Sequence, residues 1–223
     1  MSTRYQDYVI KDGRLVGDFE AMYRHASNVP WHQDRTAFEV VAEIDLAILR
    51  DADRRQPWRR ILEIGCGLGY FTGRLAATFP SARVRGADIS STAIAAAQAS
   101  HPGVEFSVLD VRQPLPSPEQ PFDLVVLKDL LWYVLPQLPQ VMANLRHLAD
   151  GGCVFVSQSI PNLPDFYGRE MFPTPAAVLQ YFENAFTLRY ASTTDERRTE
   201  RASGVYDVDL YARFLGSLPR STE

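Results

Sequence analysis

Between residues 60 and 160, short apolar runs rich in β-branched residues alternate with stretches of helical pattern. Strands that are separated by helices pair in parallel through right-handed crossovers, and the helices cover both faces of the sheet. The sequence therefore predicts a doubly wound α/β domain with its ligand site at the carboxyl ends of the strands. The five predicted strands lie in RRILEIG, ARVRGADI, VEFSVLD, FDLVVLK and GCVFVSQS.

The flanking segments complete the predicted organisation. Residues 34–52 have the apolar spacing of an amphipathic helix, with Phe38 and Val41 on its apolar side. After the fifth strand we expect a Pro- and aromatic-rich cover, a helix, and two antiparallel strands within residues 186–198 and 204–215. The segment before residue 34 has no strong pattern. We expect a lid over residues 1–33 and one domain over residues 34–223.

Composition limits the classes of partner. The net charge of −4 and the pI near 5.6 disfavour nucleic acid as a partner, because such surfaces are normally basic. The N-terminus has no apolar signal region and no apolar run approaches the length of a membrane span, so we expect a cytoplasmic protein. Two scattered cysteines, Cys66 and Cys153, indicate neither a disulfide framework nor a zinc site.

The stretch LEIGCGLGY places Gly65, Gly67 and Gly69 at the first strand-to-helix turn. Glycines allow a sharp turn and a close approach of a ligand to the backbone. The dinucleotide fingerprint requires a third glycine at position 70 or 72, where this chain has Tyr70 and Thr72. The spacing therefore disfavours a nicotinamide cofactor.

Two further carboxylates follow at the expected strand ends. Asp88 ends the second strand, where a carboxylate can accept hydrogen bonds from both hydroxyls of a ribose. The alternative is that Asp88 caps the next helix, a role that Ser90 also fits. Asp110 ends the third strand, with a solvated loop carboxylate as its alternative.

Glu63, the three glycines, Asp88 and Asp110 together resemble the motifs of the class I S-adenosylmethionine-dependent methyltransferases. The resemblance implies a Rossmann-like seven-stranded sheet in the order 3-2-1-4-5-7-6, with the last strand antiparallel and an N-terminal helical lid. It implies S-adenosyl-L-methionine as the cofactor and places Asp110 near the adenine. The implied cofactor-binding residues are Glu63, Gly65, Cys66, Gly67, Gly69, Asp88, Ile89, Asp110, Val111, Lys128 and Trp31.

The N-terminal segment is more weakly similar to the entry segment of small-molecule methyltransferases, including the nodulation-type N-methyltransferases. This similarity implies contact of Tyr23, Trp31 and His32 with the methionine end of the cofactor, where an aromatic face suits a sulfonium. The alternative is that Trp31 anchors the segment to the core.

Lys128 and Asp129 follow the fourth strand directly, beside the reactive end of such a cofactor. We predict that Asp129, Lys128 and His32 are catalytic, with Asp129 as a base or acceptor-binding group and Lys128 bound to an anionic group of the substrate. The alternative is that Lys128 and Asp129 form an ion pair, or that one faces solvent and the other caps the next turn. The expected substrate-binding residues are Tyr133, Tyr167 and Arg169.

The sequence therefore predicts methyl transfer to a nitrogen or oxygen of a small molecule, such as a sugar or natural-product intermediate. The motif of Asn or Asp, two prolines and an aromatic residue, typical of methyltransferases that act on bases or glutamine, is absent after the fourth strand. The alternatives are a protein or RNA methyltransferase and a non-catalytic cofactor-binding protein. We expect a small-molecule acceptor, no bound metal, and neither nucleic acid nor a membrane as a partner. The sequence is compatible with a homodimer.

Overall fold

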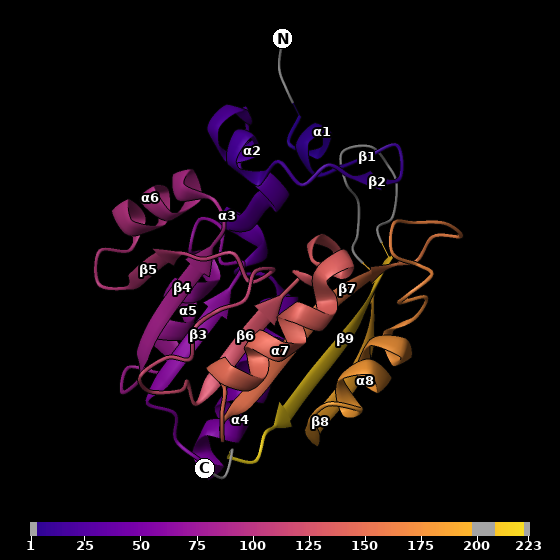
Figure 1. Ribbon diagram of the computed structural model, residues 1–223. Helices are drawn as coiled ribbons and strands as arrows, with labels where there is room; N and C mark the ends of the chain where they lie inside the picture. The colour runs from indigo at the N-terminus through magenta and orange to yellow at the C-terminus, as the bar shows by residue number, and fades with distance from the viewer. Residues whose placement is uncertain (1–3, 198–207, 221–223) are drawn as a thin grey trace.

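The computed structural model describes residues 4–197 and 208–220, and a seven-stranded sheet runs through it (Figure 1). Its order is β5-β4-β3-β6-β7-β9-β8. The first five of these strands are parallel, and β9 runs antiparallel to both β7 and β8. Numbered along the chain this is 3-2-1-4-5-7-6, so the predicted fold class is confirmed. The strands are β3 (Arg60–Ile64), β4 (Arg83–Asp88), β5 (Glu105–Val108), β6 (Leu124–Lys128), β7 (Cys153–Pro161), β8 (Thr187–Arg197) and β9 (Val208–Ser217).

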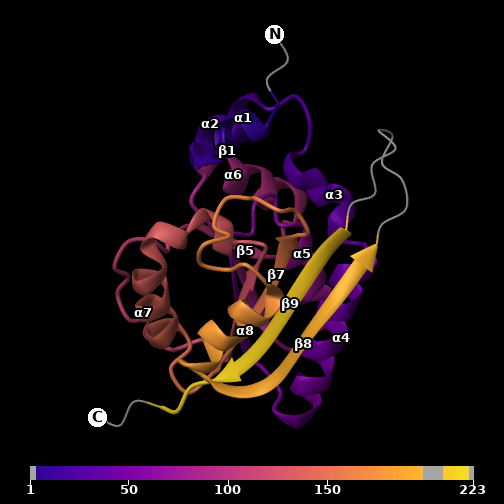
Figure 2. The ribbon, with the colours of Figure 1, turned by 90° about the vertical axis from the view of Figure 1, so that its right-hand side faces the viewer.

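Both faces of the sheet are buried, as the central strand β6 shows. Leu124 and Val126 belong to a core shared with α4 (Val40–Arg55) and α5 (Tyr70–Thr78). Val125 and Leu127 belong to another core, shared with α7 (Leu138–Leu148) and α8 (Pro175–Glu183). Figure 2 shows α4 and α7 on opposite sides of the strands. Burial on both faces explains why this strand is a continuous apolar run.

The turns after the central strands place the predicted residues at one end of the sheet. The chain leaves β3 through Gly65, Gly67 and Gly69, whose φ values of 77°, 53° and 80° favour glycine. Asp88 is the last residue of β4 and Lys128 the last of β6, the two neighbours of β3. Ser90 begins α6 (Ser91–Ser100), and its hydroxyl accepts a hydrogen bond from the Ala93 amide at 3.1 Å. These strand ends therefore meet as the sequence predicts.

Short N-terminal elements lie over this end of the sheet, opposite the arrowhead of β9 (Figure 1). One of them is a two-stranded hairpin that the sequence analysis did not predict. Its turn is Asp12 and Gly13, with φ values of 51° and 71°, a combination that suits a two-residue hairpin. The elements are α1 (Gln6–Val9), β1 (Ile10–Lys11), β2 (Arg14–Leu15), α2 (Phe19–His25), η1 (Pro30–His32) and α3 (Gln33–Thr36).

The predicted continuous helix over residues 34–52 is wrong. α3 ends at Thr36 and α4 begins at Val40, because Glu39 is extended at the N-cap position of α4. Phe38 lies in the break with 60% of its surface exposed, and the Arg74 guanidinium lies over its ring. The two C-terminal strands are confirmed, although residue 198 of the first and residues 204–207 of the second lie outside the described residues.

Candidate active site

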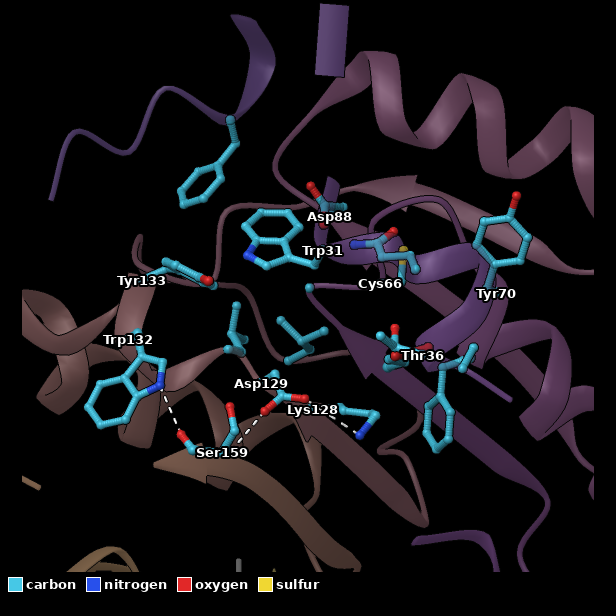
Figure 3. A pocket seen from close by; sticks show the side chains of 18 of the residues that line it. Trp31, Thr36, Cys66, Tyr70, Asp88, Lys128, Asp129, Trp132, Tyr133 and Ser159 are labelled. Atoms are coloured by element: carbon cyan, nitrogen blue, oxygen red, sulfur yellow. Dashed lines mark hydrogen bonds and ion pairs between the residues drawn. The ribbon is translucent and has the colours of Figure 1, made fainter. Parts of the chain in front are cut away.

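A cavity of about 890 Å³ lies between the carboxyl ends of the strands and the N-terminal elements (Figure 3). This volume is within the usual range of small-molecule sites. Most of the residues singled out in the sequence analysis line it, although they come from several separate segments of the chain. They are Tyr23, Trp31, His32, Glu63, Gly65, Cys66, Asp88, Ile89, Asp110, Val111, Lys128, Asp129 and Tyr133.

Four predicted residues do not line this cavity. Gly67 and Gly69 belong to the glycine turn but are packed closely against neighbouring side chains. An added Cβ at Gly69, for example, would meet Phe106. Tyr167 and Arg169 lie outside the cavity, so the structure does not bring these two predicted substrate-binding residues to it. The Arg169 guanidinium instead donates to a backbone carbonyl of its own loop, and the Phe166 ring packs against Trp132.

The backbone amides of the glycine turn are already used by the protein. A diphosphate at such a turn is normally bound by free amides. Here each amide from position 65 to 69 has a protein acceptor, so the turn itself offers no free amide to a diphosphate. The Gly65 and Cys66 amides donate to the Ala87 carbonyl, Gly67 to the Asp88 carboxylate, Leu68 to the Gln33 side chain, and Gly69 to the Cys66 carbonyl.

Asp88 has the geometry expected of a hydroxyl-binding group. Its two carboxylate oxygens accept hydrogen bonds from the Gly67 and Ser90 amides, each at 2.9 Å, which fix the side chain. A carboxylate has about four acceptor positions, so others stay available on the cavity side. Burial raises the pKa of Asp88, while the amide hydrogen bonds lower it. Because Ser90 caps α6, the alternative role of Asp88 as the cap is wrong.

Asp110 lines the cavity as half of an ion pair. Arg112 donates to its two oxygens at 2.8 and 3.0 Å, and the hydrogen bonds from Arg112 lower the pKa of the carboxyl. This planar pair holds the Asp110 carboxylate in one orientation. Val111, between the two, is buried and also lines the cavity. An apolar surface and an oriented carboxylate therefore lie together beyond β5.

Glu63 lies at the inner end of the cavity, on β3. The Thr72 hydroxyl donates to its carboxylate at 2.5 Å, and the side chain is buried. Burial raises the pKa of Glu63 to about 7, against the lowering effects of Thr72 and Lys128. Cys66 nearby is buried among apolar residues, and burial raises the pKa of its thiol. A neutral thiol is a poor nucleophile, so Cys66 serves here as packing.

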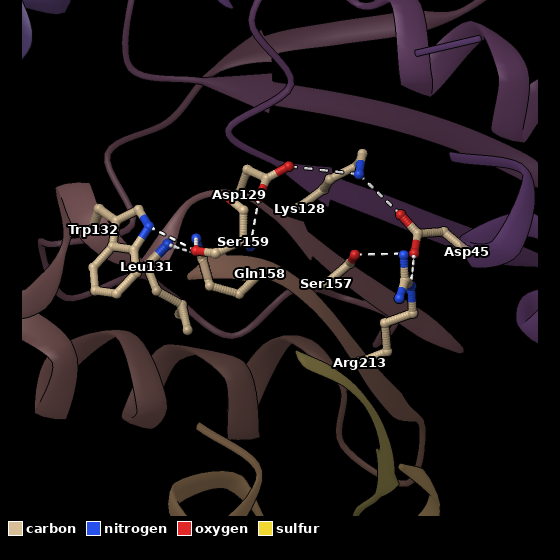
Figure 4. A network of polar contacts seen from close by, with 9 residues as sticks. All are labelled: Asp45, Lys128, Asp129, Leu131, Trp132, Ser157, Gln158, Ser159 and Arg213. Atoms are coloured by element: carbon tan, nitrogen blue, oxygen red, sulfur yellow. Dashed lines mark hydrogen bonds and ion pairs between the residues drawn. The ribbon is translucent and has the colours of Figure 1, made fainter. Parts of the chain in front are cut away.

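Lys128 is held by two carboxylates (Figure 4). Its ammonium lies 2.9 Å from Asp45 and 3.5 Å from Asp129. Burial lowers the pKa of Lys128, but the charges of Asp45 and Asp129 outweigh it and raise the pKa overall. The ion-pair alternative therefore describes the structure, with Asp45 as a nearer partner that the sequence analysis missed. Lys128 has two anionic partners before any substrate arrives.

Asp45 of α4 is fully buried between two cations. Besides Lys128, it accepts hydrogen bonds from Arg213 Nε at 2.7 Å and from the Ser157 hydroxyl at 2.9 Å. Arg213 of β9 is also fully buried. The charges of Arg213, Asp45, Lys128 and Asp129 thus alternate in sign from the core to the cavity, as Figure 4 shows. This row fixes the base of the cavity.

Strained backbone gathers at the cavity. Four described non-glycine residues have positive φ, and three of them line the cavity. Trp31 and His32 have φ of 51° and Asp129 has φ of 50°. Such conformations cost roughly 1–3 kcal/mol each and cluster at functional sites. The strain supports a functional role for these three residues.

Aromatic rings form one wall of the cavity. We call Phe19, Trp31 and Tyr133 the aromatic wall. Tyr133 joins the other two, with its ring centroid 5.4 Å from Phe19 and 5.5 Å from Trp31. Burial raises the pKa of Tyr133, so it stays a neutral phenol. This wall joins the N-terminal elements to the short helix η2 (Leu131–Tyr133) beyond β6.

Two polar side chains attach the N-terminal elements to the domain, and the sequence analysis missed both. Gln33 accepts from the Leu68 amide at 2.9 Å and donates to the Tyr23 hydroxyl at 3.1 Å. Glu20 accepts from the Thr92 amide and hydroxyl and from the Ser90 hydroxyl at the start of α6. Hydrogen bonds from Thr92 and Ser90 lower the pKa of Glu20 to about 2. Neither contact has a local sequence signal.

Comparison with known proteins shows that the chain is similar to methyltransferases. Residues 61–152 match the family described as a methyltransferase domain. The chain is 38% identical over 154 residues to the trans-aconitate 2-methyltransferase of Methylobacterium nodulans, covering 69% of this chain and 56% of that protein. It is 32% identical over 115 residues to the malonyl-[acyl-carrier protein] O-methyltransferase of Bacillus cereus, covering 50% and 42% respectively. The chain thus spans about half the length of these relatives.

Solved structures share the fold. The N-methyltransferase NodS from Bradyrhizobium japonicum in complex with S-adenosyl-L-homocysteine has a TM-score of 0.60 at 22% identity, covering 88% of this chain and 97% of NodS. Among the residues that the structure describes, no group of three or more metal-binding side chains occurs. No helix in the described part of the chain is long and apolar enough to cross a membrane.

Proposed function

This chain carries a methyltransferase domain of the class I, S-adenosylmethionine-dependent type, and from this premise we propose that the protein transfers a methyl group to a small molecule. The observation that carries the proposal is Asp88, held at the end of β4 beside a glycine turn whose own amides, from Gly65 to Gly69, have protein acceptors. Such a site suits a ligand that has a ribose. S-adenosyl-L-methionine is such a ligand.

The lining residues fit the parts of that cofactor. Asp88 would bind the ribose hydroxyls, with the Ile89 and Val111 surfaces against the adenine and Asp110 at its amino group. Gly65, Cys66, Glu63 and Trp31 would surround the methionine half, together with Lys128. Residues 1–33 would act as a lid over it, attached through Glu20 and through Gln33 at the end of the lid.

The bound sulfonium would supply an activated methyl group, so the chain has to orient the acceptor and exclude water. The acceptor atom must lie about 3 Å from the methyl carbon, opposite the sulfur. Asp129 would bind a nitrogen or oxygen nucleophile and take its proton, a role supported by its 38% exposed side chain at the cavity. His32 is a second candidate for the proton, at the N-terminal side.

A small acceptor, such as a sugar or natural-product intermediate, fits the dimensions and the charge of the site. A cavity of about 890 Å³ accommodates the cofactor and a modest second molecule. The net charge of −4 disfavours RNA. The similar enzyme of Methylobacterium nodulans is named for trans-aconitate, itself a small molecule.

Calorimetry with S-adenosyl-L-homocysteine tests the proposal. We expect saturable binding that Asp88→Ala weakens by about 1–3 kcal/mol, the usual cost of losing a charge-assisted partner. Asp51→Ala, on the exposed side of α4, is the matched control and should leave the affinity unchanged. Tight NADH binding with no S-adenosyl-L-homocysteine binding would refute the cofactor assignment. Transfer of label from S-adenosyl-L-methionine to an acceptor then separates an enzyme from a non-catalytic binding protein.

A further inference from the structure

We propose that the acceptor is an amine, bound as a cation between Asp129 and the aromatic wall, and that the methyl group is transferred to its nitrogen. This inference rests on the proposed function and names the substrate class of the same site. It is carried by the charges, the burial and the strained backbone around Asp129.

Asp129 presents a carboxylate to the cavity. Its Oδ1 accepts a hydrogen bond from the Ser159 amide at 2.8 Å, and its own amide donates to the Ser157 carbonyl at 2.8 Å. These contacts hold Asp129 in the left-handed backbone conformation. Its other oxygen lies 3.5 Å from the Lys128 ammonium, beyond a normal hydrogen bond. An incoming ammonium can therefore approach an oriented carboxylate that is 38% exposed.

The only lysine at the site is not available for an anionic substrate. Lys128 is 12% exposed and lies nearer to Asp45 than to Asp129. A substrate carboxylate that reached Lys128 would have to displace Asp129 and would meet its negative charge. Arg112 is likewise paired with Asp110. Arg35 also lines the cavity but is exposed, where water screens its charge.

The aromatic wall suits a cation. Figure 3 shows Trp31, Tyr133 and Asp129 around one part of the cavity, with Lys128 farther to one side. The faces of aromatic rings attract ammonium groups within about 6 Å, and the effect grows when water is excluded. Tyr133 and Asp129 line the same cavity, and the negative charge of Asp129 contributes, after burial, to raising the pKa of Tyr133.

Methyl transfer to an amine requires that its proton leave first. An ammonium has no lone pair, so one N–H proton passes to the Asp129 carboxylate and from there to solvent. The nitrogen lone pair then forms the new N–C bond with the methyl carbon. The C–S bond breaks and its electron pair stays on sulfur, which leaves a neutral thioether and a methylated ammonium. Charge and atoms balance with S-adenosyl-L-methionine as the only co-reactant.

Probes that differ only in their head group test this inference. The protein is saturated with S-adenosyl-L-homocysteine and titrated by NMR with benzylamine, benzyl alcohol and benzoate, and separately with trans-aconitate. We expect benzylamine to bind at least ~10-fold more tightly than the other three. Asp129→Asn should weaken benzylamine at least ~10-fold and leave S-adenosyl-L-homocysteine affinity unchanged. Asn tolerates the left-handed conformation, so this variant keeps the backbone.

Asp12→Asn is the matched control, because Asp12 has the same backbone conformation in the β1–β2 hairpin, away from the cavity. It should change neither affinity. Tighter binding of benzoate or trans-aconitate, an unchanged benzylamine affinity in Asp129→Asn, or no benzylamine binding at all would overturn the amine assignment. In each of these outcomes S-adenosyl-L-homocysteine still binds. Loss of that binding in the unaltered protein would instead overturn the proposed function.

Discussion

Replacing Asp45 with Asn should destabilise the protein strongly, although the two side chains have nearly the same shape. Asp45 is fully buried on α4 and contacts Arg213 at 2.7 Å and Lys128 at 2.9 Å. The substitution removes the one negative charge that both cations share in the core. Arg213 is fully buried and Lys128 only 12% exposed, so water cannot replace the lost carboxylate.

The magnitude follows from the burial of the partners. Removing one member of a buried ion pair typically costs 3–5 kcal/mol, because a charge is left without compensation. Asn keeps one oxygen that can accept from Arg213 or Ser157, which retains part of the hydrogen bonding. We therefore expect the free energy of unfolding to fall by about 3 kcal/mol. For a chain of this size, this corresponds to a decrease in Tm of roughly 6–12 °C.

Urea unfolding followed by circular dichroism measures this change, provided that unfolding is reversible and two-state. The matched control is Asp51→Asn on the same helix. Asp51 is 55% exposed and pairs with Arg55 at the surface, so its loss should cost only about 0–1 kcal/mol. A change below 1 kcal/mol for Asp45→Asn, or one equal to that of the control, would show that the buried row of charges is not a source of stability.

Two further substitutions test the site. Burial raises the pKa of Glu63 from 4.5 to about 7, so the folded state keeps a proton that the unfolded state loses. The free energy of unfolding should therefore fall by about 3 kcal/mol as the pH rises from 4.5 to about 7, and Glu63→Gln should remove that loss. Urea unfolding of both proteins below and above this pH range measures the loss. An equal pH dependence of the two proteins would contradict the raised pKa of Glu63. Gly67→Ala should destabilise the protein by about 1 kcal/mol, because its φ is 53° and the new Cβ would meet Gln33 and Tyr23. Faster hydrogen exchange in α2 would confirm that the N-terminal attachment is weakened, and unchanged exchange would refute it.

The sheet is predictable from the sequence because its signals are local. The central strand β6 is buried on both faces and so forms a short apolar run, and α6 starts at a recognisable capping residue, Ser90. The glycine turn is equally local, since three glycines within five residues have positive φ. Asp88 and Asp110 follow from their places at strand ends. Their lining of one cavity is then a consequence of parallel topology.

The contacts that close the cavity have no such signal. Gln33 bonds to an amide 35 positions away, and Glu20 bonds to Ser90, 70 positions away. Two-residue strands such as β1 are too short to show alternation. The break between α3 and α4 at Phe38 has no sequence signal, because the apolar spacing of α4 continues through it. These features depend on tertiary partners, which periodicity does not describe.

Asp45 shows that predicting a buried ion pair requires both local and distant information. Ala42, Leu46 and Leu49 are buried on one side of α4, and the helical period places Asp45 on that same side. A charge on the buried side of a helix requires a cation, yet its partners lie 83 and 168 positions away, so the sequence alone does not name them. Once the fold is known, the presence of the Lys128 ammonium at the end of β6 is explained. Lys128 compensates Asp45, and Asp129 is the carboxylate that β6 and its turn present to the cavity.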